Sequence, residues 1–595
     1  MSGEADSPAD LEYLTGAEPG SQHLSVAFAR GGEGGQHAQE RALSGAVGPD
    51  DRDRGTGFKG ESYRLENRVR RRRKRDVAQR NEGFHSQECM GTRLSNPRPG
   101  TCGRYIFQVE RYTKIVATMG PSVASAEAVR SLIDAGIDVA RLNFSHGDHE
   151  LHRQFADWVR EGAEKAGRNV AILQDIQGPK LRVGTFPEGA LVLTTGQTVR
   201  CYQGRSLSTE PDVIFLDYPY LLEDVEVGEE LVLADGLIRL VATGKASDHV
   251  VARVVIGGLL GNGKGVAFPG TNLRMPAITE KDEVDLAYGK VLEVDWVAAS
   301  FVKSADDIRR VRELAGDVPI IAKIELASAY ANLDEILGEA AGIMVARGDL
   351  GVQLPLERIP LIQADILRRA NEAGVVTITA TEMLESMTHS TRPTRAEVTD
   401  VANAVLAGTD AVMLSAETAA GIHPREAVEF MARICATVES ETSQNTVVHA
   451  YRTQQSAVAS AVAQAAVDCA ANLSIDTIVA FTESGSTARL LSKYRPAARI
   501  VAFTPIDSTR RRMTLYRGVA AYPFERRDYT DHMIAAAEKF LEKEGLCQRG
   551  DTVVMVAGIP PNRQASTNLL KVHMIGERTG GVQSQRSGRT SPEGR

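Results

Sequence analysis

The chain has 595 residues, of which 43% are hydrophobic and 25% charged, and its formal net charge is −8. This length and composition indicate several globular domains. The acidic balance argues against a protein built to bind nucleic acid, and no apolar run approaches the roughly 18 residues of a membrane-spanning helix. The six cysteines form no CxxC pair, which argues against a zinc site or a disulfide framework and favours the reducing cytoplasm.

Residues 1–108 differ in composition from the rest of the chain and lack sustained apolar periodicity, which predicts a disordered extension. Its acidic start argues against a secretory signal or transit peptide. The basic run Arg70–Arg75 could be a nuclear-targeting or nucleic-acid patch, but a disordered tail is the favoured interpretation. Met90 is then a candidate alternative start, which an intact mass of the native protein that includes residues 1–89 would refute. A second disordered tail is expected over residues 578–595.

From Tyr112 onwards, short apolar strands alternate with helical patterns. Eight such strands with intervening helices predict a TIM-type (β/α)₈ barrel over residues 109–186 and 275–440. The expected strands are Thr113–Thr118, Val139–Phe144, Val170–Gln174, Trp296–Phe301, Pro319–Ile324, Gly342–Ala346, Val375–Ala380 and Ala411–Leu414. Helices are expected over Ser125–Asp134, Ala305–Leu314 and Thr394–Leu406.

Two further domains complete the predicted α/β organisation. The gap after the third strand is rich in Val, Leu, Thr and Gly with turn signals, which predicts a small inserted β domain over residues 187–274. Residues 441–577 predict an open-sheet α/β domain. Its expected helices are Ser456–Ala471 and Thr487–Lys493, and its expected strands are Thr477–Thr482, Ile500–Thr504 and Thr552–Val556.

Polar groups recur where the predicted barrel strands end, which is where barrels of this type carry their active sites. A single Asp or Lys in such a place is usually a solvated loop residue, so the recurrence carries the argument. The second and third strands end in ARLNFSHG and DIQGPKLR, the fifth and sixth in AKIE and ARGDLG, and the seventh in ATEMLESM.

The fifth and sixth strand ends supply Lys323, Glu325 and Asp349. Carboxylates suit a hard divalent cation such as Mg²⁺, and a lysine beside them can hold a phosphate as a point charge. The N–H groups of Gly348 and Asp349, at the start of a short helix, suit an anion. This combination indicates phosphoryl transfer, in which positioning and charge neutralisation supply most of the catalysis.

These strings, together with TKIVATMGPS, MPAITEKD and VMLSAETA, occur in the order of the motifs of the pyruvate kinase family, which the chain resembles over about residues 110–575. The resemblance implies that Glu325 and Asp349 hold Mg²⁺ or Mn²⁺ and that phosphoenolpyruvate binds this ion. It also implies that Arg141 and Lys323 flank the phosphate, beside Gly348 and Asp349. Thr381 lies where the family protonates the enolate, although a helix-capping hydroxyl is the alternative.

For the nucleotide, the resemblance implies that ADP binds near Asn143, His146 and Arg182 with its own Mg²⁺. The resemblance also implies that the inserted domain is a β-barrel lid, from which Lys264 would close over the nucleotide.

A potassium ion in this family often binds near four residues, which correspond here to Asn143, Ser145, Asp175 and the carbonyl of Ile176. Family members that need potassium for activity tend to carry Glu where this chain has Lys180. A lysine there can place a fixed ammonium near the phosphate, so activity without potassium is expected. The alternative is that Lys180 points to solvent and potassium still binds.

Other departures from the family pattern are milder: Leu326, Gln353, Glu382 and His423 replace a usual Asn, Glu, Gln and Tyr. In the last domain, a loop between a strand and a helix matches the family's phosphorylated-sugar effector loop through Thr482, Ser484, Gly485, Ser486 and Thr487. A plain helix cap is the alternative, because the second effector loop, Gly558–Ser566, lacks the expected glycines.

The resemblance therefore implies a cytoplasmic, homotetrameric pyruvate kinase of glycolysis, which makes pyruvate and ATP from phosphoenolpyruvate and ADP. No nucleic-acid or membrane partner is expected. A metal-dependent phosphoenolpyruvate or pyruvate aldolase or mutase is the alternative enzyme, but it would not need Lys264 or Arg182. A degenerate sugar-phosphate sensor would be expected to have lost Lys323, Glu325 or Asp349, and all three are present.

Overall fold

The computed structural model describes residues 111–577, except residue 272, residues 443–456 and residues 560–566. The predicted tails, the basic run Arg70–Arg75 and Met90 lie outside the described residues. Within the described ranges, no helix is long and apolar enough to cross a membrane.

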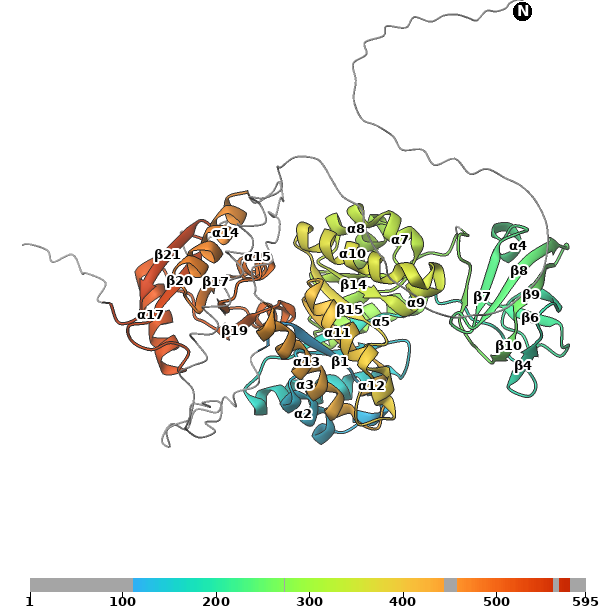
Figure 1. Ribbon diagram of the computed structural model, residues 1–595, viewed down its shortest axis with the longest axis horizontal. Coiled ribbons are helices and arrows are strands. Elements are labelled where there is room, and N and C mark those ends of the chain that lie inside the picture. The colour runs from blue at the N-terminus through green and yellow to red at the C-terminus, as the bar shows by residue number, and fades with distance from the viewer. Residues whose placement is uncertain (1–110, 272, 443–456, 560–566, 578–595) are drawn as a thin grey trace, which may run out of the picture. The chain divides into compact units, whose positions relative to one another are not determined.

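Eight parallel strands form a closed barrel in the order β1-β16-β15-β14-β13-β12-β3-β2, which confirms the predicted fold (Figure 1). The strands are β1 (Lys114–Thr118), β2 (Val139–Asn143), β3 (Ala171–Asp175), β12 (Trp296–Ala299), β13 (Ile320–Ile324), β14 (Gly342–Ala346), β15 (Val376–Ala380) and β16 (Ala411–Leu414). The fourth is shorter than predicted, because Phe301 adopts a left-handed backbone with φ +55°. The chain therefore turns at the barrel rim two residues earlier than expected.

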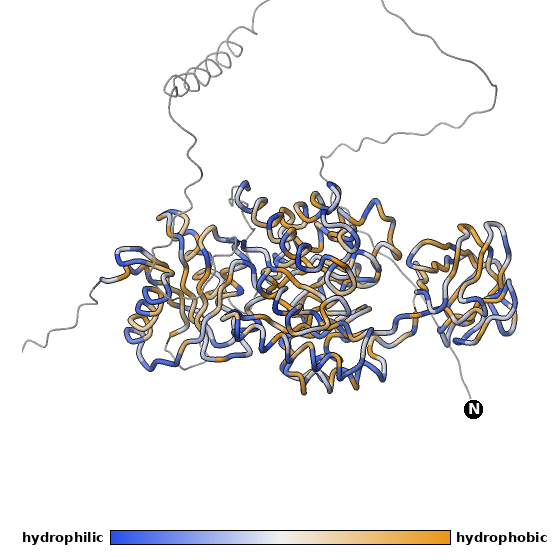
Figure 2. The backbone as a smooth tube through the Cα atoms, turned by 90° about the horizontal axis from the view of Figure 1, so that it is seen from below, coloured by the Kyte–Doolittle hydropathy of each residue, from blue (hydrophilic) through white to orange (hydrophobic). Residues whose placement is uncertain are grey.

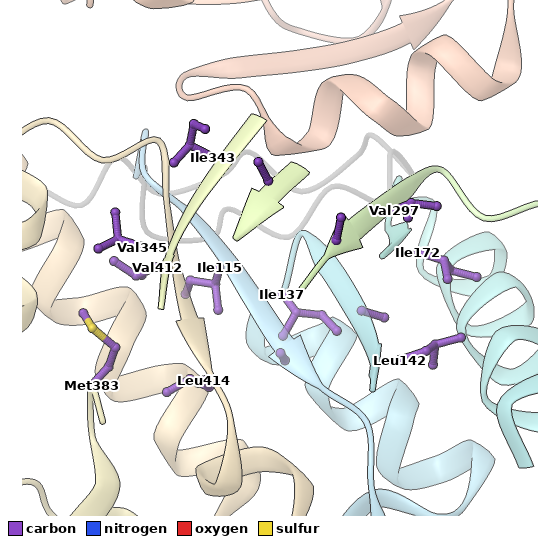
Figure 3. Close-up of a cluster of buried hydrophobic side chains, with 14 of the residues drawn as sticks. Ile115, Ile137, Leu142, Ile172, Val297, Ile343, Val345, Met383, Val412 and Leu414 are labelled. Carbon is purple, nitrogen blue, oxygen red and sulfur yellow. The ribbon is translucent and has the colours of Figure 1, made fainter. Parts of the chain in front are cut away.

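Each barrel strand is buried on both faces, as parallel strands covered by helices must be. In β14, Ile343 and Val345 belong to the layer between strands and helices, whereas Met344 belongs to a second buried cluster, which also includes residues from Ala459 onwards. Figure 3 shows part of the outer layer, including Ile115 of β1 and Ile172 of β3. Both faces are mostly apolar, although Gln174, Thr377 and Thr379 are also buried within strands.

Helices follow the strands and form the outer layer of the barrel. They are α2 (Ala126–Ala135), α3 (His149–Ala166), α5 (Glu280–Val291), α6 (Ala305–Ala315), α7 (Ala327–Ala331), α8 (Leu333–Glu339), α9 (Arg347–Gln353), α10 (Ile359–Ala373), α11 (Arg395–Leu406), α12 (Ala416–Ala419) and α13 (Pro424–Glu441), with short 3₁₀ turns η1 (Pro121–Val123), η2 (Leu356–Arg358) and η3 (Glu385–Thr388). The start of α11 is fixed by a capping box between Thr394 and Glu397.

The inserted segment is a β domain with its own buried cluster. Six strands form one sheet in the order β11-β7-β8-β9-β5-β6, and β10 pairs with β4 in a second sheet. The strands are β4 (Ala190–Leu193), β5 (Thr198–Gln203), β6 (Val213–Leu216), β7 (Glu230–Leu233), β8 (Ile238–Lys245), β9 (His249–Ile256), β10 (Gly258–Gly261) and β11 (Val266–Ala267), with one short helix, α4 (Leu221–Asp224). The domain limits 187–274 remain a prediction.

The C-terminal segment is the predicted open-sheet α/β domain, with strand order β19-β18-β17-β20-β21. Its strands are β17 (Thr477–Phe481), β18 (Arg499–Thr504), β19 (Val519–Pro523), β20 (Thr552–Ala557) and the antiparallel β21 (Leu569–Met574). Its helices are α14 (Ala457–Asn472), α15 (Ser486–Lys493), α16 (Asp507–Arg512) and α17 (Thr530–Lys543), with the 3₁₀ turn η4 (Met513–Leu515). The trace in Figure 2 shows hydrophobic and hydrophilic stretches alternating along the chain.

Polar contacts join the base of the barrel to the C-terminal domain. Lys493, at the end of α15, forms a buried ion pair with Asp410 just before β16 and donates to Asn371 at 3.0 Å. Asp295, just before β12, accepts Arg160 of the barrel at 2.9 Å and Arg511 of the C-terminal domain at 2.7 Å. Both carboxylates are almost completely buried, so each depends on its basic partners.

Candidate active site

The predicted site residues of the barrel lie at the carboxyl ends of its strands. Arg141 and Asn143 belong to the end of β2, Asp175 ends β3, and Lys323 lies in β13 with Glu325 directly after it. Asp349 lies in the first turn of α9, and Thr381 directly follows β15. The closed topology therefore brings together residues that are far apart along the chain.

Lys323 is an enclosed cation at this rim, with a side chain that is 11% exposed. Its Nζ lies 2.7 Å from Ser300 Oγ, 2.9 Å from Glu325 Oε1 and 3.2 Å from Asp175 Oδ1. Burial alone would lower the pKa of Lys323, but the two carboxylates outweigh it and raise that pKa above its ordinary value. Lys323 is therefore a permanently charged ammonium held in a fixed position.

Arg141 is fixed beside it by the same carboxylate. Its Nε donates to Asp175 Oδ2 at 2.7 Å, and its NH1 donates to Thr118 Oγ1 at 3.0 Å. Burial would raise the pKa of Asp175, but Lys323 and Arg141 outweigh this effect and lower it. Asp175 is thus an ionised anchor that aligns two cations at one end of the barrel.

Glu325 and Asp349 line a common cavity between the barrel rim and the inserted domain. Glu325 Oε2 accepts the N–H of Phe301 at 2.7 Å, and Asp349 Oδ1 lies 3.2 Å from Lys180 Nζ. Burial, and then the charge of Asp349, raise the pKa of Glu325 despite the opposing effect of Lys323. Glu325 and Asp349 are therefore a donor pair that a divalent cation would stabilise.

The described residues contain no group of three or more His, Cys, Asp or Glu side chains arranged for a metal ion. A divalent ion at Glu325 and Asp349 would therefore take its other ligands from substrate oxygens or water. Mg²⁺ suits this arrangement, because it is usually held by one or two carboxylates together with substrate phosphates.

Thr381 has a backbone conformation that a β-branched residue rarely adopts, with φ +67°. Its hydroxyl accepts the N–H of Gly348 at 3.0 Å and donates to the carbonyl of Ala380 at 2.7 Å. The strained turn therefore aims the hydroxyl towards the first turn of α9, where Asp349 also lies. Strain of this kind is maintained only where the surrounding structure enforces it.

Arg347 enforces this turn, and the sequence analysis assigned it no role. Its Nε donates to Ala380 O at 3.1 Å, its NH2 donates to Thr381 O at 2.5 Å, and its NH1 pairs with Asp400 at 2.6 Å. Arg347 thereby joins β15, α9 and α11 behind the site.

Ser300 and Phe301 also belong to the site, and the sequence did not predict them as site residues. Ser300 Oγ bridges Lys323 Nζ and the carbonyl of Ile176, which it contacts at 2.7 Å, and the Phe301 N–H holds Glu325. The polar serine at the end of β12, directly after an apolar strand, was the signal that could have found them.

Of the predicted nucleotide residues, Asn143 ends β2 and His146 lies in the loop after it, whereas Arg182 and Lys264 lie where the barrel meets the inserted domain. Arg182 NH1 donates to Gly263 O at 3.0 Å, and the Lys264 carbonyl accepts the N–H of Val183 at 2.9 Å. Partial burial and the nearby cations Arg182, Arg141 and Lys180 lower the pKa of His146. The imidazole is therefore neutral at pH 7.

The four residues of the predicted potassium pocket belong to the ends of β2 and β3 and the loops after them. The Asn143 Oδ1 accepts the N–H of Ser145 at 3.2 Å, and Ile176 O accepts Ser300. Lys180 directs its ammonium to Asp349 instead. Its side chain is 30% exposed, so it lies partly in solvent while it pairs with that carboxylate.

The predicted effector loop belongs to the C-terminal domain and not to the barrel rim. It turns through Gly485 at φ +84°, and Gly485 N donates to Thr482 Oγ1 at 2.9 Å. Ser484 Oγ donates to Ser486 Oγ at 3.0 Å, and Thr487 contacts Thr567 at 2.8 Å. Most of the second loop, residues 560–566, lies outside the described residues.

Comparisons with known proteins agree with this geometry. The family model described as pyruvate kinase, barrel domain, matches residues 110–428, and the one described as pyruvate kinase, alpha/beta domain, matches residues 460–573. The chain is 43% identical over 478 residues to a pyruvate kinase of Geobacillus stearothermophilus, covering 79% of this chain and 81% of that protein. It is 43% identical over 479 residues to a pyruvate kinase of Dictyostelium discoideum, covering 78% and 94%.

A solved structure leads to the same assignment. The crystal structure of a pyruvate kinase from Cryptosporidium parvum is similar with a TM-score of 0.74 and 36% sequence identity, over 78% of this chain and 96% of that chain. Both domain models, these relatives and the closed barrel with its polar rim agree, and the chain belongs to the pyruvate kinase family.

Proposed function

We propose that the residues at the barrel rim transfer the phosphoryl group of phosphoenolpyruvate to ADP, giving pyruvate and ATP, as the family's name implies. The observation that carries this assignment is the enclosed Lys323, held between Asp175 and Glu325 with Arg141 on the far side of Asp175. Two fixed cations beside a pair of carboxylates suit a transferring phosphate and a metal ion.

Arg141 and Lys323 would bind the phosphate of phosphoenolpyruvate. Both are already oriented by Asp175, so they need little reorganisation when charge moves from the enol oxygen to the nucleotide. Lys323 would neutralise the phosphoryl group in transfer, and the N–H of Asp349 in the first turn of α9 would contact the substrate carboxylate, while the N–H of Gly348 holds Thr381.

Glu325 and Asp349 would hold the divalent ion, Mg²⁺ or Mn²⁺, which supplies Lewis-acid stabilisation of the phosphate and enolate oxygens. The two side chains line one cavity, and Lys323 and Lys180 compensate their charge in the metal-free protein. A second Mg²⁺ would arrive with ADP.

Thr381 would deliver a proton to the enolate carbon, through ordered water. Its hydroxyl is fixed between Gly348 N and Ala380 O, so the donor position is set before substrate binds. The helix-cap alternative does not account for the strained φ of +67°.

ADP would bind on the side of the site that faces the inserted domain. Arg182, already bonded to Gly263 of that domain, would contact the diphosphate with Asn143 and the neutral His146, and Lys264 would close over the nucleotide. Lys180 would supply the cationic charge that potassium supplies in other members, so that potassium is dispensable.

Three further features belong to the same proposal. The loop Thr482–Thr487 would receive a phosphorylated effector. The chain would assemble as a homotetramer, for which exposed apolar side chains such as Leu361 on α10 are suitable contacts. It would act in glycolysis in the cytoplasm, where its free cysteines stay reduced.

A coupled assay of pyruvate release tests the reaction. Pyruvate should form from phosphoenolpyruvate only when both ADP and Mg²⁺ are present, with ATP produced in equal amount. Pyruvate release that does not depend on ADP would instead support the aldolase or mutase alternative, and no turnover would support the sensor. Repeating the assay with sugar phosphates tests the effector loop, and sedimentation of the full chain tests the tetramer.

A further inference from the structure

The pairing of Lys180 with Asp349 points to a role for this lysine before any substrate arrives. Their Nζ and Oδ1 atoms are 3.2 Å apart, and the side chains are 30% and 34% exposed. The two residues are 169 positions apart, on the loop after β3 and the first turn of α9. Two parts of the site therefore meet at this ion pair.

The pair and a divalent ion would use the same carboxylate. Glu325 is already neutralised by Lys323 at 2.9 Å, which leaves Lys180 as the cation that compensates Asp349. A divalent ion on Asp349 would repel an ammonium only 3.2 Å from that oxygen. Because a half-exposed ion pair is weak, the ion can displace the lysine.

Residues of the inserted domain lie next to Lys180. A side-chain carbon on Gly265 would lie 3.7 Å from Lys180 Cε, an ordinary van der Waals contact, and 3.0 Å from Asp235 Oδ1, so Gly265 of the inserted domain lies against both side chains. Leu181, the next residue, accepts the N–H of Val266 at 3.0 Å. The position of Lys180 is thus coupled to the inserted domain.

We propose that Lys180 is an internal competitor for the divalent-metal carboxylate: it occupies Asp349 in the metal-free protein and is displaced when the ion binds. Displacement releases the ammonium into the cavity shared by Asp235, Gly265 and Glu325, where substrate phosphates would then attract it. This inference rests on the proposed metal site. Lys180 acts here as a positioning residue: it changes the affinity of the substrate-free protein for the divalent ion before any chemical step.

Manganese titration of the substrate-free full chain tests this, by water-proton relaxation or calorimetry at fixed pH and ionic strength. Lys180→Met should bind Mn²⁺ about two- to five-fold more tightly than wild type, the range expected when a half-exposed ion pair no longer competes. Lys245→Met, which removes an equal charge from an ion pair with Glu226 in the inserted domain, should leave the affinity unchanged. Circular dichroism verifies that each variant is folded.

Asp349→Asn separates failure of this inference from failure of the metal site. It should weaken Mn²⁺ binding, and adding Lys180→Met to it should then have no further effect. One outcome is that Asp349→Asn weakens Mn²⁺ binding while Lys180→Met binds Mn²⁺ as wild type does or more weakly. In that case Lys180 does not compete with the ion, but Asp349 is still a metal ligand. If Asp349→Asn leaves Mn²⁺ affinity unchanged, the metal site itself is wrong. If Lys245→Met tightens Mn²⁺ binding as much as Lys180→Met does, the effect comes from the change in net charge, and the proposed competition by Lys180 is wrong.

Discussion

The N–H of Gly348 donates to the hydroxyl of Thr381 at 3.0 Å, which joins the start of α9 to the end of β15. Thr381 holds this position from a left-handed backbone with φ +67°. The proposed proton donor and the proposed metal ligand Asp349 are therefore placed by one local structure, and a disturbance of the turn should affect proton delivery more than substrate binding.

Arg347→Met should lower kcat by roughly ten- to a hundredfold, because the carbonyls of Ala380 and Thr381 lose the guanidinium that holds the strained turn. The KM for phosphoenolpyruvate should change much less, since Arg141 and Lys323 remain in place. Steady-state kinetics checks this, with Arg368→Met on the exposed face of α10 as the control. A variant with raised KM and unchanged kcat would contradict the positioning role.

Lys323→Met should reduce kcat about a thousandfold, because a preorganised charge next to the transferring phosphoryl group is lost. Mn²⁺ binding should persist, since Glu325 and Asp349 remain. The coupled assay and a Mn²⁺ titration measure the two effects separately. Loss of both would mean that Lys323 acts mainly by holding Asp175 and Glu325 in position.

Replacing potassium with a bulky organic cation should leave the rate within a few-fold of its value in potassium, because Lys180 already places a cation at the site. The measurement is initial velocity at constant ionic strength. A rate that falls by an order of magnitude would show that potassium still binds near Asn143 and Asp175.

Asp138→Asn should destabilise the protein by about 3 kcal/mol near pH 7, as expected for breaking a buried ion pair. Asp138 pairs with Arg111 at 2.7 Å and accepts the N–H of Ile115 at 2.8 Å. Burial would raise the pKa of Asp138, but Arg111, Lys114 and Arg168 outweigh it and lower that pKa.

A folded-state pKa below the unfolded value of about 3.9 gives stability that is present above that value and lost as pH falls through the folded pKa. The difference in unfolding midpoint between wild type and Asp138→Asn should therefore shrink below about pH 4. Thermal unfolding followed by circular dichroism between pH 3 and 7 measures it. Asp134→Asn, at an exposed pair with Arg130, is the control and should change little. A difference independent of pH would refute the electrostatic explanation.

The barrel was predictable because its strands are short apolar runs, buried on both faces, with polar residues directly after them. Strands β19 and β21 were missed: Val519–Pro523 ends in a proline, and Leu569–Met574 is an edge strand whose apolar pattern is interrupted by Lys571 and His573. Edge strands carry a weaker sequence signal because only part of their surface is buried.

Within the site, residue types at strand ends predicted Lys323, Glu325 and Asp349 directly. Ser300 was missed because a lone serine after an apolar strand has no distinctive chemistry until Lys323 is seen beside it. The contact between Lys180 and Asp349 joins residues 169 positions apart, so only the folded chain could reveal it. The sequence showed which residue types lie at the strand ends, but it did not show which of these side chains contact one another.

The contacts between the base of the barrel and the C-terminal domain limit how these two domains can be separated or exchanged. Asp410 depends on Lys493, Asp295 on Arg511, and the Trp296 indole donates to the carbonyl of Arg512 at 3.3 Å. A barrel produced alone would leave Asp410 without Lys493 and Asp295 with Arg160 as its remaining basic partner. A chimera carrying a relative's C-terminal domain would need basic residues at the same positions to restore these contacts. Exchange of that domain should therefore succeed only when these basic residues and their carboxylates are transferred as a set.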